Sequence, residues 1–138
     1  MGRILTLRGV VPTNRKERIF FFDSNIQNRG WKIKDFQVLP NDISAGYTTA
    51  AVLHTTDITI AFADWDPNTT VGINITSKEN NNQTMIDSDH VVVGNLYFTN
   101  LTPNQPVSYM ITLEELDITP SQNIMYQLKE VAQNSANN

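Results

Sequence analysis

The sequence of 138 residues contains no cysteine and carries ten Lys and Arg against fourteen Asp and Glu, a formal net charge of -4 at pH 7. A chain of this length is expected to form a single domain, 1–138, with a sizeable buried core. The lack of cysteine excludes disulfides, thiolate zinc sites and cysteine nucleophiles. The acidic balance argues against a nucleic-acid partner, which needs a basic surface to replace condensed counterions. No apolar stretch approaches the roughly 18 residues that span a bilayer, so we expect a soluble chain without a membrane partner.

Apolar and polar residues alternate along most of the chain up to about residue 117, and this period of two is typical of half-buried β-strands. Strands are expected at 4–11, 18–22, 31–38, 48–54, 57–62, 70–75, 91–98 and 107–113. Clusters of Asn, Asp, Gly and Pro separate these segments at intervals of about ten residues. The pattern predicts an all-β sandwich for a body of about residues 1–117, jelly-roll-like by strand count, with an immunoglobulin-like sandwich as the second choice.

Two of these segments carry more specific patterns. Strict alternation makes 57–62 the clearest strand, because every second side chain is a large apolar one. In 31–38 the apolar residues move from odd to even positions after Ile33. A regular strand would then turn half of these side chains outward, so we predict a β-bulge near Lys34 and Asp35.

In the second half of the chain, a glycine predicts a break in one strand and a run of asparagines predicts a loop. Gly94 interrupts the apolar run of 91–98 and predicts a break in that strand. The stretch 77–84, which contains a run of asparagines, is too polar for a core and is expected to form an exposed loop tip.

The period changes near the C-terminus, where an amphipathic α-helix is expected at about 119–133, followed by a frayed tail at 134–138. Thr119 is an N-cap residue, Pro120 suits the first helical position, and Gln122 completes a capping box. The apolar stripe of this helix consists of Ile124, Leu128 and Val131. Its two candidate partners are the open end of the body and a neighbouring subunit, and packing within the chain is favoured.

Asp87, Asp89 and His90 are candidate metal ligands or acid–base groups. In a strand that begins at His90, Asp89 and His90 point to opposite faces, so the three side chains do not converge. The segment lacks the twelve-residue calcium pattern, with its central Gly and distal Glu. Asp and Ser bond their own backbone in turns, and a polar turn that leads into a strand is the favoured interpretation.

A second acidic pair, Asp64 and Asp66, flanks Trp65. The spacing places both carboxylates on one side of an extended segment, as a calcium site or a two-carboxylate glycosidase requires. Residues 66–68, Asp-Pro-Asn, are also residue types that commonly form turns, and a turn is favoured over a calcium or catalytic site. An exposed Trp65 would stack on a sugar, which keeps a glycan-binding module as the alternative function.

The sequence contains no recognisable catalytic constellation. His54 and His90 are the only histidines, too few for a three-ligand catalytic zinc site without help from carboxylates. A G-x-S-x-G nucleophile elbow, a P-loop and a dinucleotide fingerprint do not occur. We therefore expect a protein that is not an enzyme and that needs neither a cofactor nor a metal ion.

Three stretches of the sequence resemble a known group of proteins. They are NRGWKIKDFQV (28–38), IDSDHVVVGNLYFTN (86–100) and YMITLEELDITPSQNIMYQLKEVAQN (109–134). The similar proteins are small virion structural components, capsid or capsid-associated, encoded by marine phages and archaeal viruses. The resemblance implies location in the virion, assembly with copies of itself and with other virion proteins, and an architectural role for the segment DSDHVVV.

Two surfaces are candidate contacts in such an assembly. The first, the basic segment, consists of Arg3, Arg8, Arg15 and Arg18. Its acidic counterparts on a neighbouring copy would be Glu114, Glu115 and Asp117. The second is the apolar stripe of the C-terminal helix. The alternative interpretation of the basic segment is ordinary solvated surface.

Overall fold

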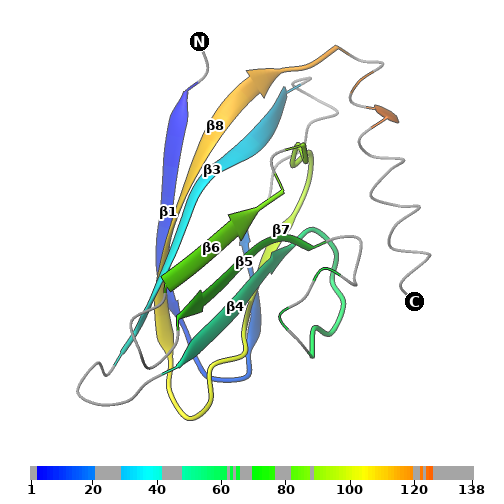
Figure 1. Cartoon of the computed structure of the whole chain (residues 1–138). Coiled ribbons are helices and arrows are strands. Elements are labelled where there is room, and N and C mark those ends of the chain that lie inside the picture. The colour runs from blue at the N-terminus through cyan, green and yellow to red at the C-terminus, as the bar shows by residue number, and fades with distance from the viewer. Residues whose placement is uncertain are drawn as a thin grey trace.

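The structure, a computed structural model, describes residues 3–20, 29–41, 48–61, 63, 65, 70–76, 82–87, 89–119, 122, 124 and 125. The strands are β1 (Ile4–Val11), β2 (Lys16–Phe20), β3 (Arg29–Pro40), β4 (Thr49–His54), β5 (Thr70–Thr76), β6 (Asn82–Ile86), β7 (Leu96–Asn100) and β8 (Val107–Asp117). They form two antiparallel sheets (Figure 1), a three-stranded sheet of order β1-β8-β3 and a five-stranded sheet of order β2-β7-β4-β5-β6. The expectation of a body built from β-strands is confirmed.

One apolar core lies between the two sheets. The three-stranded sheet contributes Phe36, Ile111 and Leu113, and the five-stranded sheet contributes Leu53 and Phe98, all of them buried. The rings of Phe36 and Phe98 meet edge to face with their centroids 6.0 Å apart, an arrangement that aromatic pairs prefer. Alternate positions of the central strand β8 thus supply the core, as the period of two predicts.

The predicted bulge in β3 is present. The register of β3 on β8 shifts between Ile33 and Asp35, so Lys34 is an extra residue in the strand. The Asp35 carboxylate accepts a hydrogen bond from the Phe36 amide, with Oδ1 and N 3.0 Å apart. In a regular strand Ile33 and Phe36 would face opposite sides, and the bulge turns both of them into the core.

Deletion of Lys34 is expected to be tolerated, because the remaining residues then alternate regularly and keep Ile33 and Phe36 inward. The lost side chain makes a partly exposed ion pair with an N–O distance of 3.9 Å, and such pairs contribute about 0–1 kcal/mol. Deletion of Gln37, beyond the bulge, is expected to turn Val38 outward and unfold the chain. Thermal unfolding followed by circular dichroism compares the two variants, and equal losses of stability would contradict the bulge.

The segment 57–62 is not a strand in its described part, residues 57–61, so the prediction of a strand there is wrong. Burial does alternate in this segment, and Ile60 is buried. No described strand pairs with it, and the Ile58 carbonyl accepts a hydrogen bond from the Lys16 ammonium at 3.4 Å instead. A period of two in the sequence indicates that burial alternates. A β-strand also needs a neighbouring strand with which its backbone forms hydrogen bonds.

Strand β6 occupies part of the stretch expected to be a loop tip. Residues 82–84 lie in β6, so the prediction is wrong for them, and residues 77–81 lie outside the described residues. Among the described strands β6 pairs only with β5 and forms an edge of the five-stranded sheet. An edge strand tolerates polar side chains because one of its sides faces solvent.

The apolar run 91–98 is broken near Gly94, as predicted. Strand β7 begins at Leu96, whereas Val92 forms an isolated bridge with Trp31 through two backbone hydrogen bonds of 2.9 and 2.7 Å. The neighbouring Gly30 allows this close approach, since a Cβ atom there would overlap the side chain of Val91. The bridge covers the beginning of the outer edge of β3.

The segment after β8 begins with the predicted capping box. The Thr119 amide donates to Gln122 Oε1 at 2.9 Å, and the Gln122 amide donates to Thr119 Oγ1 at 3.1 Å. Ile124, the first residue of the expected apolar stripe, is 58% exposed. Leu128 and Val131 lie outside the described residues, so the C-terminal helix and its packing stay predictions. Within the described ranges, no helix has the length and apolar character needed to cross a membrane.

Candidate interaction surface

The segment that contains Asp87, Asp89 and His90 is a turn. The Asp87 carboxylate accepts a hydrogen bond from the Asp89 amide, with Oδ1 and N 3.2 Å apart. The Asp87 carbonyl accepts a second one from the His90 amide at 3.3 Å. Asp89 is exposed whereas His90 is buried, so these side chains do not converge. The predicted polar turn is confirmed.

No group of three or more His, Asp or Glu side chains could hold a metal ion in the part of the chain that the structure describes. The second acidic pair, Asp64 and Asp66, lies outside the described residues. Trp65 between them is described and is 42% exposed. Its exposure is what stacking on a sugar requires, and the contribution of the two carboxylates stays a prediction.

His54 is a buried residue of the core. Its Nδ1 donates to the Thr56 carbonyl at 2.9 Å, and in the neutral ring Nε2 then accepts from the Thr99 hydroxyl at 2.7 Å. Burial lowers the pKa of His54 from 6.5 to about 4, and the Tyr97 ring stacks on the imidazole with centroids 5.7 Å apart. Sequence reasoning missed this role because Thr99 lies 45 residues away along the chain.

Arg3 of the basic segment is paired within its own chain. Its guanidinium donates to both carboxylate oxygens of Glu115, at 3.2 and 3.0 Å, and Arg29 Nη1 lies 3.3 Å from the same carboxylate. The hydrogen bonds from Arg3 are the main reason why the pKa of Glu115 is lowered. Within one chain Glu115 thus already pairs with Arg3 and Arg29, and a contact between this carboxylate and an arginine of a neighbouring copy stays a prediction.

The other members of the basic segment lie on different elements. Arg8 is exposed on β1, and Arg18 is exposed on β2. Arg15 lines a depression of about 380 Å³ next to Lys16, whose ammonium forms an ion pair with Asp57. The four arginines therefore do not form one continuous basic surface, and of these three only Arg8 lies in the three-stranded sheet.

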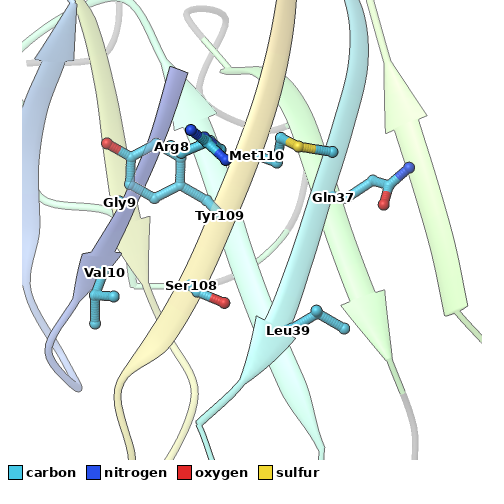
Figure 2. Close-up of a pocket in the computed structure, with 8 residues that line it drawn as sticks. All are labelled: Arg8, Gly9, Val10, Gln37, Leu39, Ser108, Tyr109 and Met110. Atoms are coloured by element: carbon cyan, nitrogen blue, oxygen red, sulfur yellow. The ribbon is translucent and has the colours of Figure 1, made fainter. Parts of the chain in front are cut away.

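The outer face of the three-stranded sheet, which points away from the core, carries exposed apolar side chains. The register aligns Val10, Ser108 and Leu39 in one row across β1, β8 and β3, and Arg8, Met110 and Gln37 in the next row. These rows line a shallow depression of about 590 Å³, which Figure 2 shows. Val10 is 59% exposed and Leu39 62%. An antiparallel sheet with one face in water normally presents polar side chains on that face, so this surface is unusual.

The sequence contains the signal for this surface, although sequence reasoning used it only to predict a strand. Along β1, Leu5, Leu7 and Val11 face inward, while Ile4 and Val10 face outward. The strand is therefore apolar on both of its faces. Exposed apolar surface of this kind marks interaction sites when it is contiguous.

Strand β1 is firmly joined to β8. The two strands pair over eight consecutive residues without a shift of register. On the inner face the Tyr109 ring lies across Gly9, where it occupies the place of a side chain, and it stacks on Phe98 with centroids 5.1 Å apart. An aromatic ring over a strand glycine restores packing that the missing side chain would lose.

No family model matches the sequence, and no curated protein matches it. Function is therefore inferred from the structure of the described residues. Two of its features bear on function, the order of the strands in the two sheets and the exposed apolar side chains of the outer face.

Proposed function

We propose that the protein is a non-enzymatic virion structural protein with a jelly-roll fold, which assembles through contacts with copies of itself. The observation that carries this proposal is the strand order. Strand β1 pairs with β8, β2 with β7 and β4 with β5. A long antiparallel hairpin of eight strands pairs in this way when it rolls up into two sheets. Jelly rolls have this eight-stranded, two-sheet architecture and form viral capsid domains.

The same strand order argues against the immunoglobulin-like alternative. In that sandwich the first two strands of the chain lie in one sheet, which has the order ABED. Here β1 and β2 lie in different sheets, and β8 lies between β1 and β3. The jelly roll is therefore the better description of this topology.

A rolled hairpin also requires β3 to lie beside β6, and side chains provide this contact. The Phe36 carbonyl of β3 accepts hydrogen bonds from the Thr84 hydroxyl of β6 at 3.1 Å and from the Asn74 amide of β5 at 3.4 Å. Asn74 also donates to Thr84 at 2.7 Å. The backbone ladder of β6 runs to β5, while this polar group joins β6 to β3 at the corner between the sheets.

A fold by itself assigns no function, because jelly rolls also occur in lectins and cupins. The outer face adds the second argument for a structural role. Ile4, Val10, Leu39 and Met110 are exposed there, and contact with another protein would remove them from water. Together with the resemblance of three sequence stretches to virion proteins, this surface favours assembly over an independent monomer.

The proposal is tested by the state of the purified protein and by its presence in particles. Size-exclusion chromatography with light scattering over a range of concentrations is expected to show defined oligomers, and negative-stain electron microscopy is expected to show closed or regular assemblies. Mass spectrometry of gradient-purified virus particles is expected to find the protein in many copies. A monomer at every concentration, together with its absence from particles, would overturn the proposal.

A glycan-binding module is the second candidate function, and the exposure of Trp65 is the observation that favours it. Jelly rolls serve as lectin domains, and an exposed indole is a stacking surface for a sugar ring. A glycan array probed with the wild type and with Trp65→Ala separates the two functions. Binding that the substitution abolishes supports the module, and a blank array removes it.

A further inference from the structure

The outer edge of β1 is open in the described part of the molecule. β1 forms its ladder with β8 along one edge, and no described strand lies along the other. The outer edge of β3, at the opposite side of the same sheet, is covered by the Trp31–Val92 bridge and by the side-chain hydrogen bonds to Phe36. Figure 1 shows β1 at the border of the sheet. Its outward amide and carbonyl groups are therefore available to another strand.

The sequence of β1 lacks the features that usually protect an edge strand. Proteins keep edges from pairing with short strands, prolines, bulges and charged side chains. β1 has eight residues, ILTLRGVV, with no proline, no bulge and one charge, Arg8. Its Ile, Leu, Val and Thr residues have high strand propensity. Such an edge favours the addition of a further strand.

The exposed side chains of β1 are arranged symmetrically about Leu7. Ile4 and Val10 lie on the outer face at equal distances along the strand from Leu7, and each is 59% exposed. Thr6 and Arg8 are the two outward residues that flank it. When two identical strands pair antiparallel around a two-fold axis through Leu7, each residue meets the one on the other side of the centre. Ile4 then meets Val10 of the second copy, and Thr6 meets Arg8.

We propose that β1 pairs with β1 of a second copy around a two-fold axis at Leu7, so that two three-stranded sheets join into one continuous sheet. The partner is therefore another copy of this chain, and the inference rests on the proposed function because it names one contact of that assembly. The dimer contains two contacts between Ile4 of one copy and Val10 of the other, one on each side of the axis, and both contacts bury these exposed side chains. Each Arg8 faces a neutral Thr6 of the other copy.

Neighbouring registers are less favourable. A shift by one residue sets outward side chains of one copy opposite inward side chains of the other. A shift by two residues in one direction sets Arg8 directly opposite Arg8 of the second copy, and like charges at that spacing repel. A shift by two in the other direction sets Thr6 opposite Thr6 and Ile4 opposite Arg8, and Val10 loses its apolar partner. Among these registers, only the one centred on Leu7 sets exposed apolar side chains of the two copies opposite each other.

Cysteine cross-linking tests both the contact and its register, because the chain contains no cysteine of its own. Directly opposite residues of antiparallel strands have Cα atoms about 4.5 to 5.5 Å apart, within the range of a disulfide, whereas diagonal neighbours are about 7–8 Å apart. Thr6→Cys and Arg8→Cys change exposed positions. We expect oxidation to cross-link a mixture of the two variants into a heterodimer and to leave each variant alone without a cross-link.

Each other outcome contradicts the inference in a recognisable way. Cross-linking of Arg8→Cys alone, or of Thr6→Cys alone, would show β1 pairing in a shifted register and would overturn the axis at Leu7. No disulfide in any sample, while light scattering still shows oligomers, would overturn the β1 contact and leave the proposed assembly intact. Monomers in every sample, including the wild type, would remove the proposed assembly itself.

A pair of charge substitutions adds a matched control. Ile4→Lys is expected to weaken self-association roughly tenfold, because the Ile4–Val10 contact occurs twice in the dimer. Met85→Lys changes an exposed apolar residue of β6, 37% exposed against 59%, in the five-stranded sheet and away from both the outer face and the β1 edge. Dilution followed by light scattering is expected to leave this variant unchanged. An equal effect of both substitutions would show that an added charge weakens association wherever it is placed, and would contradict the β1 contact.

Discussion

Replacement of Asn100 by alanine is expected to lower the free energy of unfolding by about 3–5 kcal/mol, since each buried polar group left unpaired costs about 1–3 kcal/mol. Asn100 is fully buried at the end of β7. Its Nδ2 donates to the carbonyls of Val11 and Pro12, at 3.0 and 3.1 Å, and its Oδ1 accepts from the Thr102 amide at 2.8 Å. The Nδ2 group also lies 3.4 Å from the Gln105 carbonyl. The side chain thus joins the end of β1 to the loop after β7, and its removal leaves four backbone groups without this partner.

Asn100→Asp is expected to be more severe than Asn100→Ala. In this variant the donating NH2 group is replaced by a carboxylate oxygen, which cannot donate and would face the carbonyl oxygens of Val11 and Pro12 at a buried position. A domain of this size has a total stability of about 5–15 kcal/mol, so this variant is expected to be largely unfolded.

Urea unfolding followed by tryptophan fluorescence measures these losses. Asn104→Gly, in the loop that follows β7, is the matched control. Asn104 has a φ of 65°, a backbone conformation that glycine adopts freely, so this variant is expected to stay within about 0.5 kcal/mol of the wild type. A loss below 1 kcal/mol for Asn100→Ala would contradict the role assigned to Asn100.

Acidification is expected to destabilise the protein through His54, by about 2–3 kcal/mol between pH 7.5 and pH 4.5. The pKa of His54 is lowered from 6.5 to about 4, chiefly by burial, with the positive charge of Lys16 acting in the same direction and Asp57 acting against it. Above pH 6.5 the ring is neutral in both states. As the pH falls from 6.5 towards 4 the unfolded chain takes up a proton that the folded chain does not, so stability is lost across this window.

The contribution of His54 is isolated by comparison with His54→Gln, which does not titrate. Carboxylates also add pH dependence below about pH 5, and they are common to both proteins. Unfolding free energies measured in urea from pH 7.5 to 4.5 are expected to fall more steeply for the wild type than for the variant. The same slope in both proteins would show that His54 is not protected from protonation in the folded state.

Local features of the fold follow from the sequence because they depend on neighbours along the chain. The bounds of β1, the bulge at Lys34, the turn at Asp87 and the capping box at Thr119 agree with the structure. Each of them depends on side chains within a few residues, through alternation, backbone hydrogen bonding by Asp, or reciprocal capping.

Features that need a distant partner did not follow from the sequence. Residues 57–61 alternate in burial but have no strand beside them, while the polar residues of β6 form a strand because β5 lies next to them. Glu115 binds Arg3, which lies 112 residues earlier in the chain. A ladder or an ion pair of this kind depends on which elements are brought together, and local residue patterns carry no information on that choice.

The properties of the candidate interaction surface are likewise of two kinds, local ones and ones that depend on distant parts of the chain. The sequence by itself determined that β1 is apolar on both of its faces and carries a single charge, Arg8, because these properties belong to the residues of one strand. Only the tertiary structure decided that β8 occupies one edge of this strand while the other edge stays open among the described residues, and that Ile4 and Val10 face away from the core. The physical reason is that edge position and exposure depend on the elements packed around a strand.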